Sequence, residues 1–346
     1  MIRGAIGRLG RRDRQPAPRS GCALILLYHR VAKVRSDPWS LAVTPRRFEE
    51  HLEVLRREAR PMRLEQLSKA LVDGELPERA VVVTFDDGYA DNLYNARPLL
   101  ERYEVPATIF LPSGLIGSQR EFWWDELERL LLQPGKLPGT LYLNISGHAY
   151  RWHLDEATRY PRVDFLRNRR WRAWEDPPSP RHSLYKSLWE LMHPLPDNER
   201  YRVLVELRTW AGVEQAGRPS HRLLSLEEAI DIAGESLVDI GAHTVSHPSL
   251  STLPLESQRG EILNSKAQLE VLAGRPVVGF SYPYGKRSDY SAQTVSLVRD
   301  AGFTYACSNV PGVVTQSTDR FQLPRIHAHN WDGESFWEHL LEWFDG

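Results

Sequence analysis

Short apolar runs rich in β-branched residues alternate with amphipathic helical patterns, and this alternation constrains the fold more than any other feature of the sequence. Runs that are apolar at nearly every position are typical of strands covered on both faces. Their alternation with helices predicts a parallel sheet or a β/α barrel. The predicted strands span 22–28, 80–85, 106–111, 237–241, 277–282, 303–307 and 323–326, and the predicted helices span 45–58, 64–72, 90–103, 225–233, 255–273 and 289–301.

The segment 121–222 interrupts this alternation. It contains many arginines, seven of the eleven tryptophans, and helical patterns at 183–194 and 197–211. We expect it to be a largely helical insertion between two barrel strands, within one domain that spans 21–346. Residues 1–20 are expected to form a basic, flexible tail.

Composition excludes several classes of protein. The formal net charge of −1 provides no basic field, so we expect no nucleic-acid partner. The two cysteines are too few for a disulfide framework or a cysteine-built zinc site. The apolar run at 22–28 is too short for a signal peptide, and no segment approaches the ~18 apolar residues of a membrane span. We therefore expect a protein that is cytoplasmic or peripheral to the inner face of the membrane. For the tail, solvated disorder is favoured over contact with an anionic membrane.

Two adjacent carboxylates follow the predicted strand 80–85. Asp86 and Asp87 stand at its carboxyl end, where β/α folds place their active sites, and Gly88 permits a tight turn into the next helix. Neighbouring ionised acids repel each other, and a bound cation relieves that repulsion and lets the two acids take different roles. Taken alone, the pattern fits equally well a helix N-terminus that favours acids.

Two histidines four residues apart follow the predicted strand 237–241. His243 and His247 share one face of a helical turn and can reach one metal ion. Thr244 stands where a metalloprotease has its glutamate, so a general base has to come from elsewhere, and Asp86 is available. A lone histidine pair is more often hydrogen-bonded in a core or on a surface. Together with the two aspartates, the pair favours a metal site with two imidazoles and one carboxylate as ligands, as in open catalytic zinc sites.

A third motif, Pro283-Tyr284-Gly285, follows the predicted strand 277–282. Such a turn can aim a backbone N–H into a pocket and stabilise an oxyanion, while the ring of Tyr284 can form a wall. An ordinary turn is the alternative, and without the other two motifs it would be preferred.

Together these motifs resemble the polysaccharide deacetylases of carbohydrate esterase family 4, the NodB-like homology domain. The family pattern Thr-Phe-Asp-Asp-Gly is matched by residues 84–88, and His-Ser/Thr-x-x-His-Pro by residues 243–248. Residues 27–31 and 280–285 are similar to the exopolysaccharide-associated branch, which handles polymers of the poly-N-acetylglucosamine type. The resemblance covers about 22–120 and 223–330.

The resemblance implies a distorted (β/α)7-type barrel and a metal-dependent hydrolase. It implies Asp86 as general base and Tyr284 as oxyanion donor. The implied ligands of a divalent metal are Asp87, His243 and His247; Zn²⁺ is the first choice, with Co²⁺, Ni²⁺ or Mn²⁺ as alternatives. The expected partner is an N-acetylated polysaccharide or a lipid-linked oligosaccharide.

Two departures from the family pattern leave roles open. The arginine that precedes the Pro-Tyr turn and orients the base is absent, because Phe280 and Ser281 stand there; Arg325, at another strand end, is our candidate substitute. The family's late leucine–histidine motif supplies the general acid, and His327 fits it loosely. His29 is an equally good candidate by position and is favoured in the exopolysaccharide branch. A hydrogen-bonded structural role is the alternative for each histidine.

Aromatic residues near the predicted strand ends are candidates for binding sugar rings. We expect Tyr284, Tyr89, Trp39 and Trp331 to bind substrate, and Trp123 and Trp124 lie near the same loops. For each tryptophan, a place in the core is at least as well supported.

Three functions fit these features. The first is N-deacetylation of a polymeric or lipid-linked N-acetylhexosamine in an exopolysaccharide or cell-surface glycan. The second is a non-catalytic carbohydrate-binding homologue, which the missing arginine favours and the intact Asp86 opposes. The third is a related metal hydrolase that acts on an O-acetyl ester or a cyclic amide, and only substrate assays separate it from the first.

Overall fold

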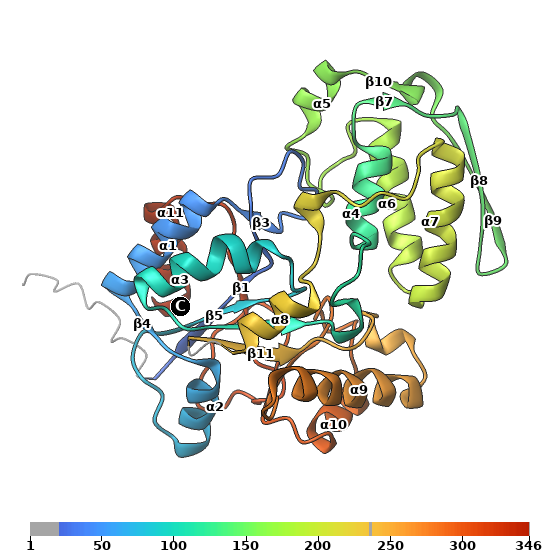
Figure 1. Cartoon of the computed structure of the whole chain (residues 1–346). Helices are drawn as coiled ribbons and strands as arrows, with labels where there is room; N and C mark the ends of the chain where they lie inside the picture. The colour runs from blue at the N-terminus through green and yellow to red at the C-terminus, as the bar shows by residue number, and fades with distance from the viewer. Residues whose placement is uncertain (1–20, 235–236, 346) are drawn as a thin grey trace, which may run out of the picture.

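The computed structural model describes residues 21–234 and 237–345 of the 346-residue chain (Figure 1). The predicted tail at 1–20 lies outside the described residues. A β/α body occupies the lower part of the view, and a smaller helical unit rises above it. None of the helices in the described ranges has the length and hydrophobicity that a membrane span requires.

Seven strands form a curled sheet in which every pairing is parallel. They are β1 (Ala23–Tyr28), β5 (Ala80–Phe85), β6 (Ala107–Leu111), β11 (Val238–Ala242), β12 (Gly279–Ser281), β13 (Tyr305–Cys307) and β14 (Ile326–His327). Their order in space is β14-β1-β5-β6-β11-β12-β13, and β4 (Arg60–Pro61) pairs with the start of β5. An isolated parallel bridge between Cys307 and Leu323 links β13 to the segment that leads into β14. The sheet therefore curls toward closure as an incomplete barrel, which confirms the predicted fold class.

Burial explains why the strands are so apolar. Every residue of β1 and of β5 is buried, because helices cover one side of the sheet and the curled sheet encloses the other. Strand β14 begins later than the predicted strand 323–326, because Leu323 contributes the bridge to Cys307 rather than pairing with β1.

The predicted helices surround this sheet (Figure 1). They are α1 (Pro45–Glu58), α2 (Leu64–Asp73), α3 (Arg97–Tyr103), α8 (Leu226–Ala233), α9 (Leu255–Ala273) and α10 (Ala292–Asp300). The pattern predicted as one helix over 90–103 is divided, since a π-helical turn, η1 (Asn92–Ala96), precedes α3. A further helix, α11 (Gly333–Asp345), was not predicted and packs against α1. Its buried residues Phe336, Leu340 and Phe344 have the spacing of an amphipathic helix.

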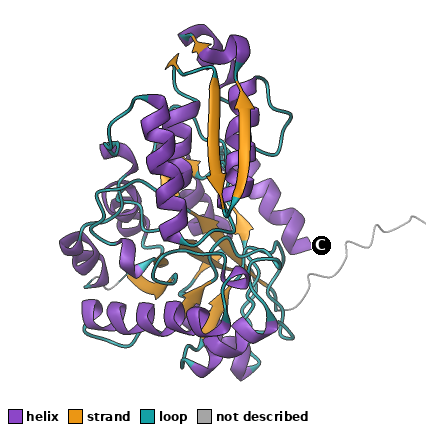
Figure 2. Cartoon of the chain, turned by 90° about the vertical axis from the view of Figure 1, so that its right-hand side faces the viewer, coloured by secondary structure: helices purple, strands orange, loops and turns teal. Residues whose placement is uncertain are grey.

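The insertion has its own elements and its own core. Helices α4 (Trp123–Leu131), α6 (Pro180–Met192) and α7 (Asp197–Ala211) pack together, and α6 and α7 match the predicted helical patterns. An antiparallel hairpin, β8 (Thr140–Ile145) and β9 (His148–His153), stands beside these helices (Figure 2) and was not predicted. The short elements of the insertion are β7 (Gly135–Lys136), β10 (Arg159–Tyr160), α5 (Arg162–Asn168) and the 3₁₀ helices η3 (Asp155–Thr158) and η4 (Pro219–His221).

The turn of this hairpin has a local signal in the sequence. Ser146 and Gly147 connect its strands with φ values of 50° and 82°, as a tight hairpin turn with two left-handed residues requires. The insertion leaves the body after β6 and returns at α8, so it stands beside the carboxyl ends of the parallel strands. Those ends meet at one edge of a parallel sheet, where active sites form.

Candidate active site

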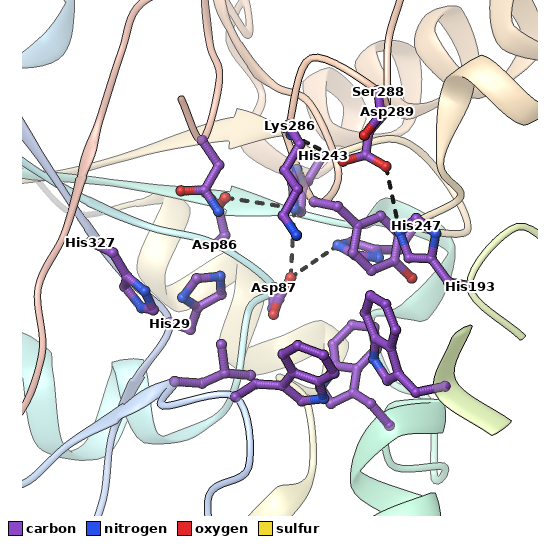
Figure 3. Close-up of a pocket in the computed structure, with 16 residues that line it drawn as sticks. His29, Asp86, Asp87, His193, His243, His247, Lys286, Ser288, Asp289 and His327 are labelled. Carbon is purple, nitrogen blue, oxygen red and sulfur yellow. Dashed lines mark hydrogen bonds and ion pairs between the residues drawn. The ribbon is translucent and has the colours of Figure 1, made fainter. Parts of the chain in front are cut away.

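Three side chains from two distant strand ends converge on one point. Asp87 follows β5, while His243 and His247 follow β11, and all three are buried. The carboxylate oxygen Oδ1 of Asp87 lies 3.5 Å from Nε2 of His243 and 3.2 Å from Nε2 of His247 (Figure 3). The three candidate ligand atoms lie within 4.8 Å of one another. The structure thus brings together the group that the sequence suggested for a divalent metal.

The surroundings of these ligands fit a metal ion. Nδ1 of His243 lies 2.8 Å from the carbonyl oxygen of Ser281, to which it donates, so its Nε2 keeps a lone pair for a cation. Burial would raise the pKa of Asp87, but the neighbouring imidazoles of His243 and His247 outweigh burial and hold it far below its usual value. Burial lowers the pKa of His247 to about 4. An ionised carboxylate and imidazole nitrogens are the donors that zinc and similar ions prefer.

The backbone is strained around these residues. Four residues of the site adopt the left-handed region although they are not glycines: Asp87 (φ 77°), Thr244 (φ 65°), His247 (φ 57°) and Tyr284 (φ 59°). Such conformations are costly and persist where the surrounding structure enforces them, commonly at functional sites. Their concentration after β5, β11 and β12 supports a functional role for this edge of the sheet.

Asp86 is held by a buried ion pair. Nη1 and Nη2 of Arg325 lie 2.8 Å and 2.6 Å from its two carboxylate oxygens, a bidentate arrangement. The hydroxyl of Ser281 donates to Asp86 over 3.1 Å and accepts from Arg325 over 2.9 Å. Arg325 therefore lies against Asp86, as expected of a substitute for the arginine that orients the base in the family.

Further hydrogen bonds fix the arginine itself. Its Nε donates to the carbonyl oxygen of Ser308 over 2.8 Å, and Nη1 lies 3.3 Å from Oγ1 of Thr84. Burial would raise the pKa of Asp86, but Arg325 and His243 outweigh it and lower that pKa. Asp86 is therefore a carboxylate at neutral pH, and its orientation is set by a guanidinium that cannot rotate freely.

The two candidate acids lie side by side. The rings of His29 and His327 are 5.3 Å apart, and both line the cavity. Burial lowers the pKa of His29, which Asp87 and Asp86 partly offset, whereas the charges that act on His327 all lower its pKa further. Figure 3 shows His29 between His327 and Asp87. His29 is thus the histidine that faces the carboxylates.

The two aspartates and the four histidines of the site border one cavity of about 250 Å³. Trp39 and Tyr284 line it, as expected for residues that bind substrate. Tyr89 does not: it is fully buried, its hydroxyl donates to Asp125 over 2.7 Å, and it packs in the core of the insertion. Trp331 also lies outside the cavity lining, against the rings of His329 and His339. The structure therefore does not support direct substrate contact by Tyr89 or Trp331.

Sequence reasoning missed several residues that line the cavity. The insertion contributes Trp124, Trp189 and His193, and the loop after β12 contributes Lys286 and Asp289. Trp124 was named only as a residue near a strand end. The sequence offers no local signal for Trp189 and His193, because their approach depends on how the insertion packs against the barrel. Lys286 and Asp289 follow the Pro-Tyr-Gly turn within four residues, and this proximity was the available signal.

Comparison with known proteins agrees with this geometry. A family model described as polysaccharide deacetylase matches residues 73–135 and 214–306. These ranges contain Asp86, Asp87, His243, His247 and the Pro-Tyr turn. The chain contains a polysaccharide deacetylase domain. The unmatched stretch between the two ranges, 136–213, corresponds to most of the insertion.

One relative and two solved structures show further similarities. The chain is 33% identical to the poly-β-1,6-N-acetyl-D-glucosamine N-deacetylase of Staphylococcus epidermidis, over 28% of this chain and 38% of that protein. It therefore spans less than two fifths of the length of that relative. The Streptococcus pyogenes deacetylase PplD superposes with a TM-score of 0.57 at 17% identity, covering 95% of this chain and 99% of that one. IcaB from Ammonifex degensii superposes with a TM-score of 0.56 at 17% identity, covering 94% of this chain and 98% of that one. At these identities the two structures support the deacetylase fold.

Proposed function

We propose that this protein is a metal-dependent N-deacetylase that removes acetyl groups from a polymeric N-acetylhexosamine. The observation that supports this most is the pairing of two neighbouring acids with different partners. Asp87 faces His243 and His247, while Asp86 is held by Arg325. One acid is thus available to a cation, and the other is left as a base.

The substrate class rests on the relatives. The matched Staphylococcus protein is a deacetylase of poly-β-1,6-N-acetyl-D-glucosamine. Of the two structural neighbours, PplD is a deacetylase, and IcaB has a similar fold. We propose a related N-acetylated polysaccharide for this chain, either free or linked to a lipid at the membrane. The proposal includes a position on the cytoplasmic side of the membrane and contact with the membrane surface.

Asp86 acts as the general base in the proposed reaction. It removes a proton from water as the water oxygen attacks the acetyl carbonyl carbon. Arg325 and Ser281 keep the carboxylate ionised and correctly oriented, so the proton is taken at a fixed position. The arginine orients the base from the segment that leads into β14, which makes the missing arginine before the Pro-Tyr turn unnecessary.

The remaining steps use two other residues. The backbone N–H of Tyr284 is proposed to donate to the developing oxyanion, and its strained φ of 59° supports this special role. As the carbon–nitrogen bond breaks, His29 donates a proton to the departing amine, which leaves acetate and a free amino sugar. Burial lowers the pKa of His29, and Asp87 and Asp86 partly offset this lowering and favour the protonated ring that the step requires.

Asp87, His243 and His247 would hold the metal ion. A divalent ion there would polarise the acetyl carbonyl and make the attacking water more acidic. We propose Zn²⁺, because one carboxylate and two imidazoles with room for exchangeable ligands are typical of catalytic zinc sites. Co²⁺, Ni²⁺ and Mn²⁺ are the alternatives, because the same donors accept them.

Acetate release tests this proposal. Acetylated β-1,6-glucosamine oligomers are incubated with the protein as purified, after chelation, and after zinc is returned. We expect acetate release in the first and third samples and none in the second. The variant Asp86→Asn should release no acetate in any of the three. Turnover that is unaffected by chelation would refute metal dependence. Release from O-acetyl esters alone would favour an esterase.

A further inference from the structure

A continuous line of aromatic rings leads away from the candidate metal site. The ring of His247 lies 4.8 Å from Tyr284, and Tyr284 lies 4.2 Å from His193. His193 stacks on Trp189 at 4.8 Å, and Trp189 lies 4.3 Å from Trp39. All five residues line the cavity, and we call this line of rings the aromatic wall. The rings come from loops of the barrel and from the insertion, which supplies His193 and Trp189.

The wall has a polar partner where the insertion meets the barrel. Nε2 of His193 lies 3.5 Å from Oδ1 of Asp289, as the dashed line in Figure 3 shows. Asp289 is held in turn by the hydroxyl of Ser249 at 3.0 Å and the backbone N–H of Lys286 at 3.0 Å. An apolar surface with a few fixed polar groups is the usual composition of a ligand pocket.

We propose that the aromatic wall, with the polar groups of His193 and Asp289, is a second sugar subsite formed jointly by the barrel loops and the insertion. It would bind an uncharged pyranose next to the one whose acetamide lies at Asp86. Ring faces would pack on Trp39 and Trp189, and hydroxyl groups would reach His193 and Asp289. This inference rests on the proposed function and makes it more specific: the substrate is an oligomer of at least two sugars.

The electrostatics of the wall suit a neutral ligand. Burial, followed by the nearby charge of Arg200, lowers the pKa of His193 to about 4, so its ring is neutral at pH 7. A neutral imidazole beside a carboxylate can donate to and accept from sugar hydroxyls without favouring an ionic group.

Chain-length dependence tests the subsite. We expect Trp189→Ala to lower the ratio of kcat/KM for a tetramer to that for a monomer by about tenfold, the effect of ~1.4 kcal/mol. The matched control is Trp152→Ala in β9, which is also half-buried in the insertion but lies outside the cavity. The proposal would be overturned if Trp189→Ala lowered kcat/KM equally for tetramer and monomer. It would also be overturned if Trp152→Ala changed the tetramer-to-monomer ratio of kcat/KM by the same amount.

Binding measurements separate this inference from the proposed reaction. Tetramer affinity for the chelator-treated protein is measured by calorimetry in wild type and Trp189→Ala. Weaker binding in the variant supports the subsite even where wild type releases no acetate, and equal binding refutes it. If Trp189→Ala does not fold, Trp39→Ala at the other end of the wall has the same expected result.

A separate observation concerns Arg200 of α7, which is buried. Its guanidinium donates to three backbone carbonyl oxygens: Met192 at 3.0 Å, His193 at 2.8 Å and His247 at 3.3 Å. Within the described ranges, no carboxylate lies at ion-pair distance from it. One side chain of the insertion therefore joins the end of α6 to the strained loop that presents His247.

We infer that Arg200 is a positioning residue for the metal site. Groups outside the ligand set orient the ligands, and their loss typically weakens metal binding by about 10–100-fold. We expect Arg200→Met to weaken zinc affinity within that range, measured by competition with a chromogenic chelator. Partial recovery is expected in Arg200→Lys, which keeps the charge and some donors.

Arg208 on the same helix provides the control. It is also buried, but its guanidinium pairs with Glu126 at 2.9 Å inside the insertion rather than with the loop that presents His247. Arg208→Met should lower the melting temperature and leave zinc affinity near that of wild type. Wild-type zinc affinity in Arg200→Met, or an equal loss in Arg208→Met, would refute the positioning role.

Discussion

Replacing Arg325 by methionine tests the buried ion pair that organises the site. The change removes the bidentate partner of Asp86 and leaves a carboxylate that is 3% exposed, with the Ser281 hydroxyl as its remaining close donor. Breaking a buried pair by removing one partner costs about 3–5 kcal/mol, because the other charge stays buried without compensation. We expect a loss of that size in the free energy of unfolding at pH 7.

The pH dependence of this loss gives the sharper result. In the wild type, the pKa of Asp86 lies below its unfolded value, so the ionised group stabilises the fold above about pH 4 and this stabilisation is lost as the pH falls through the lower folded pKa. In Arg325→Met, burial dominates and raises the pKa above the unfolded value. The variant should therefore recover much of its deficit as the pH falls from 7 toward 4.

Urea unfolding of chelator-treated protein at several pH values measures this effect. The double variant Asp86→Asn/Arg325→Met serves as control, because it removes the buried charge together with its partner. We expect it to be more stable at pH 7 than Arg325→Met alone. A deficit that is the same at pH 5 and pH 8, or a double variant as unstable as the single one, would refute the reasoning.

Three further predictions concern individual residues. Asp86→Asn should lower kcat by about 10²–10⁴-fold, the usual contribution of a general base, while zinc stoichiometry stays at the wild-type value; retained turnover would remove Asp86 as the base. His243→Ala should lose zinc, as metal analysis after gel filtration would detect, and unchanged stoichiometry would contradict its place in the ligand set. His29→Ala should lower kcat more than His327→Ala does, because His29 faces the carboxylates, and the reverse order in steady-state assays would assign the acid to His327.

The grouping of acids and histidines at the strand ends could be predicted because its signals are local. Asp86 and Asp87 follow an apolar strand directly, and His243 and His247 follow another. Parallel strands bring such ends to one edge whatever the details of packing. Arg325 was predicted from its place near the end of the expected strand 323–326. In the structure it precedes β14, and its side chain reaches Asp86.

The failures came where position in the chain does not determine position in space. Tyr89 follows the acidic motif by two residues, yet the turn at Gly88 (φ 69°) sends the chain into the insertion's core, where Tyr89 bonds to Asp125. Trp189 and His193 lie about a hundred residues from that motif, and no periodic pattern marks which face of α6 borders the cavity. Their place depends on the packing of two units, which sequence spacing does not encode.

The barrel and the insertion should affect different properties of the protein. The family model matches the segments that contain the base and the candidate metal ligands and omits 136–213, whereas that omitted stretch supplies Trp189 and His193 to the cavity. Changes in the barrel should therefore alter the rate on every acetylated substrate, because they affect the reacting groups. Changes in the insertion should alter the discrimination between substrates, because a subsite that binds the neighbouring sugar contributes differently to long and short chains. Arg200 crosses this division, since it bonds to both His193 and His247, so its loss should affect discrimination and metal affinity together.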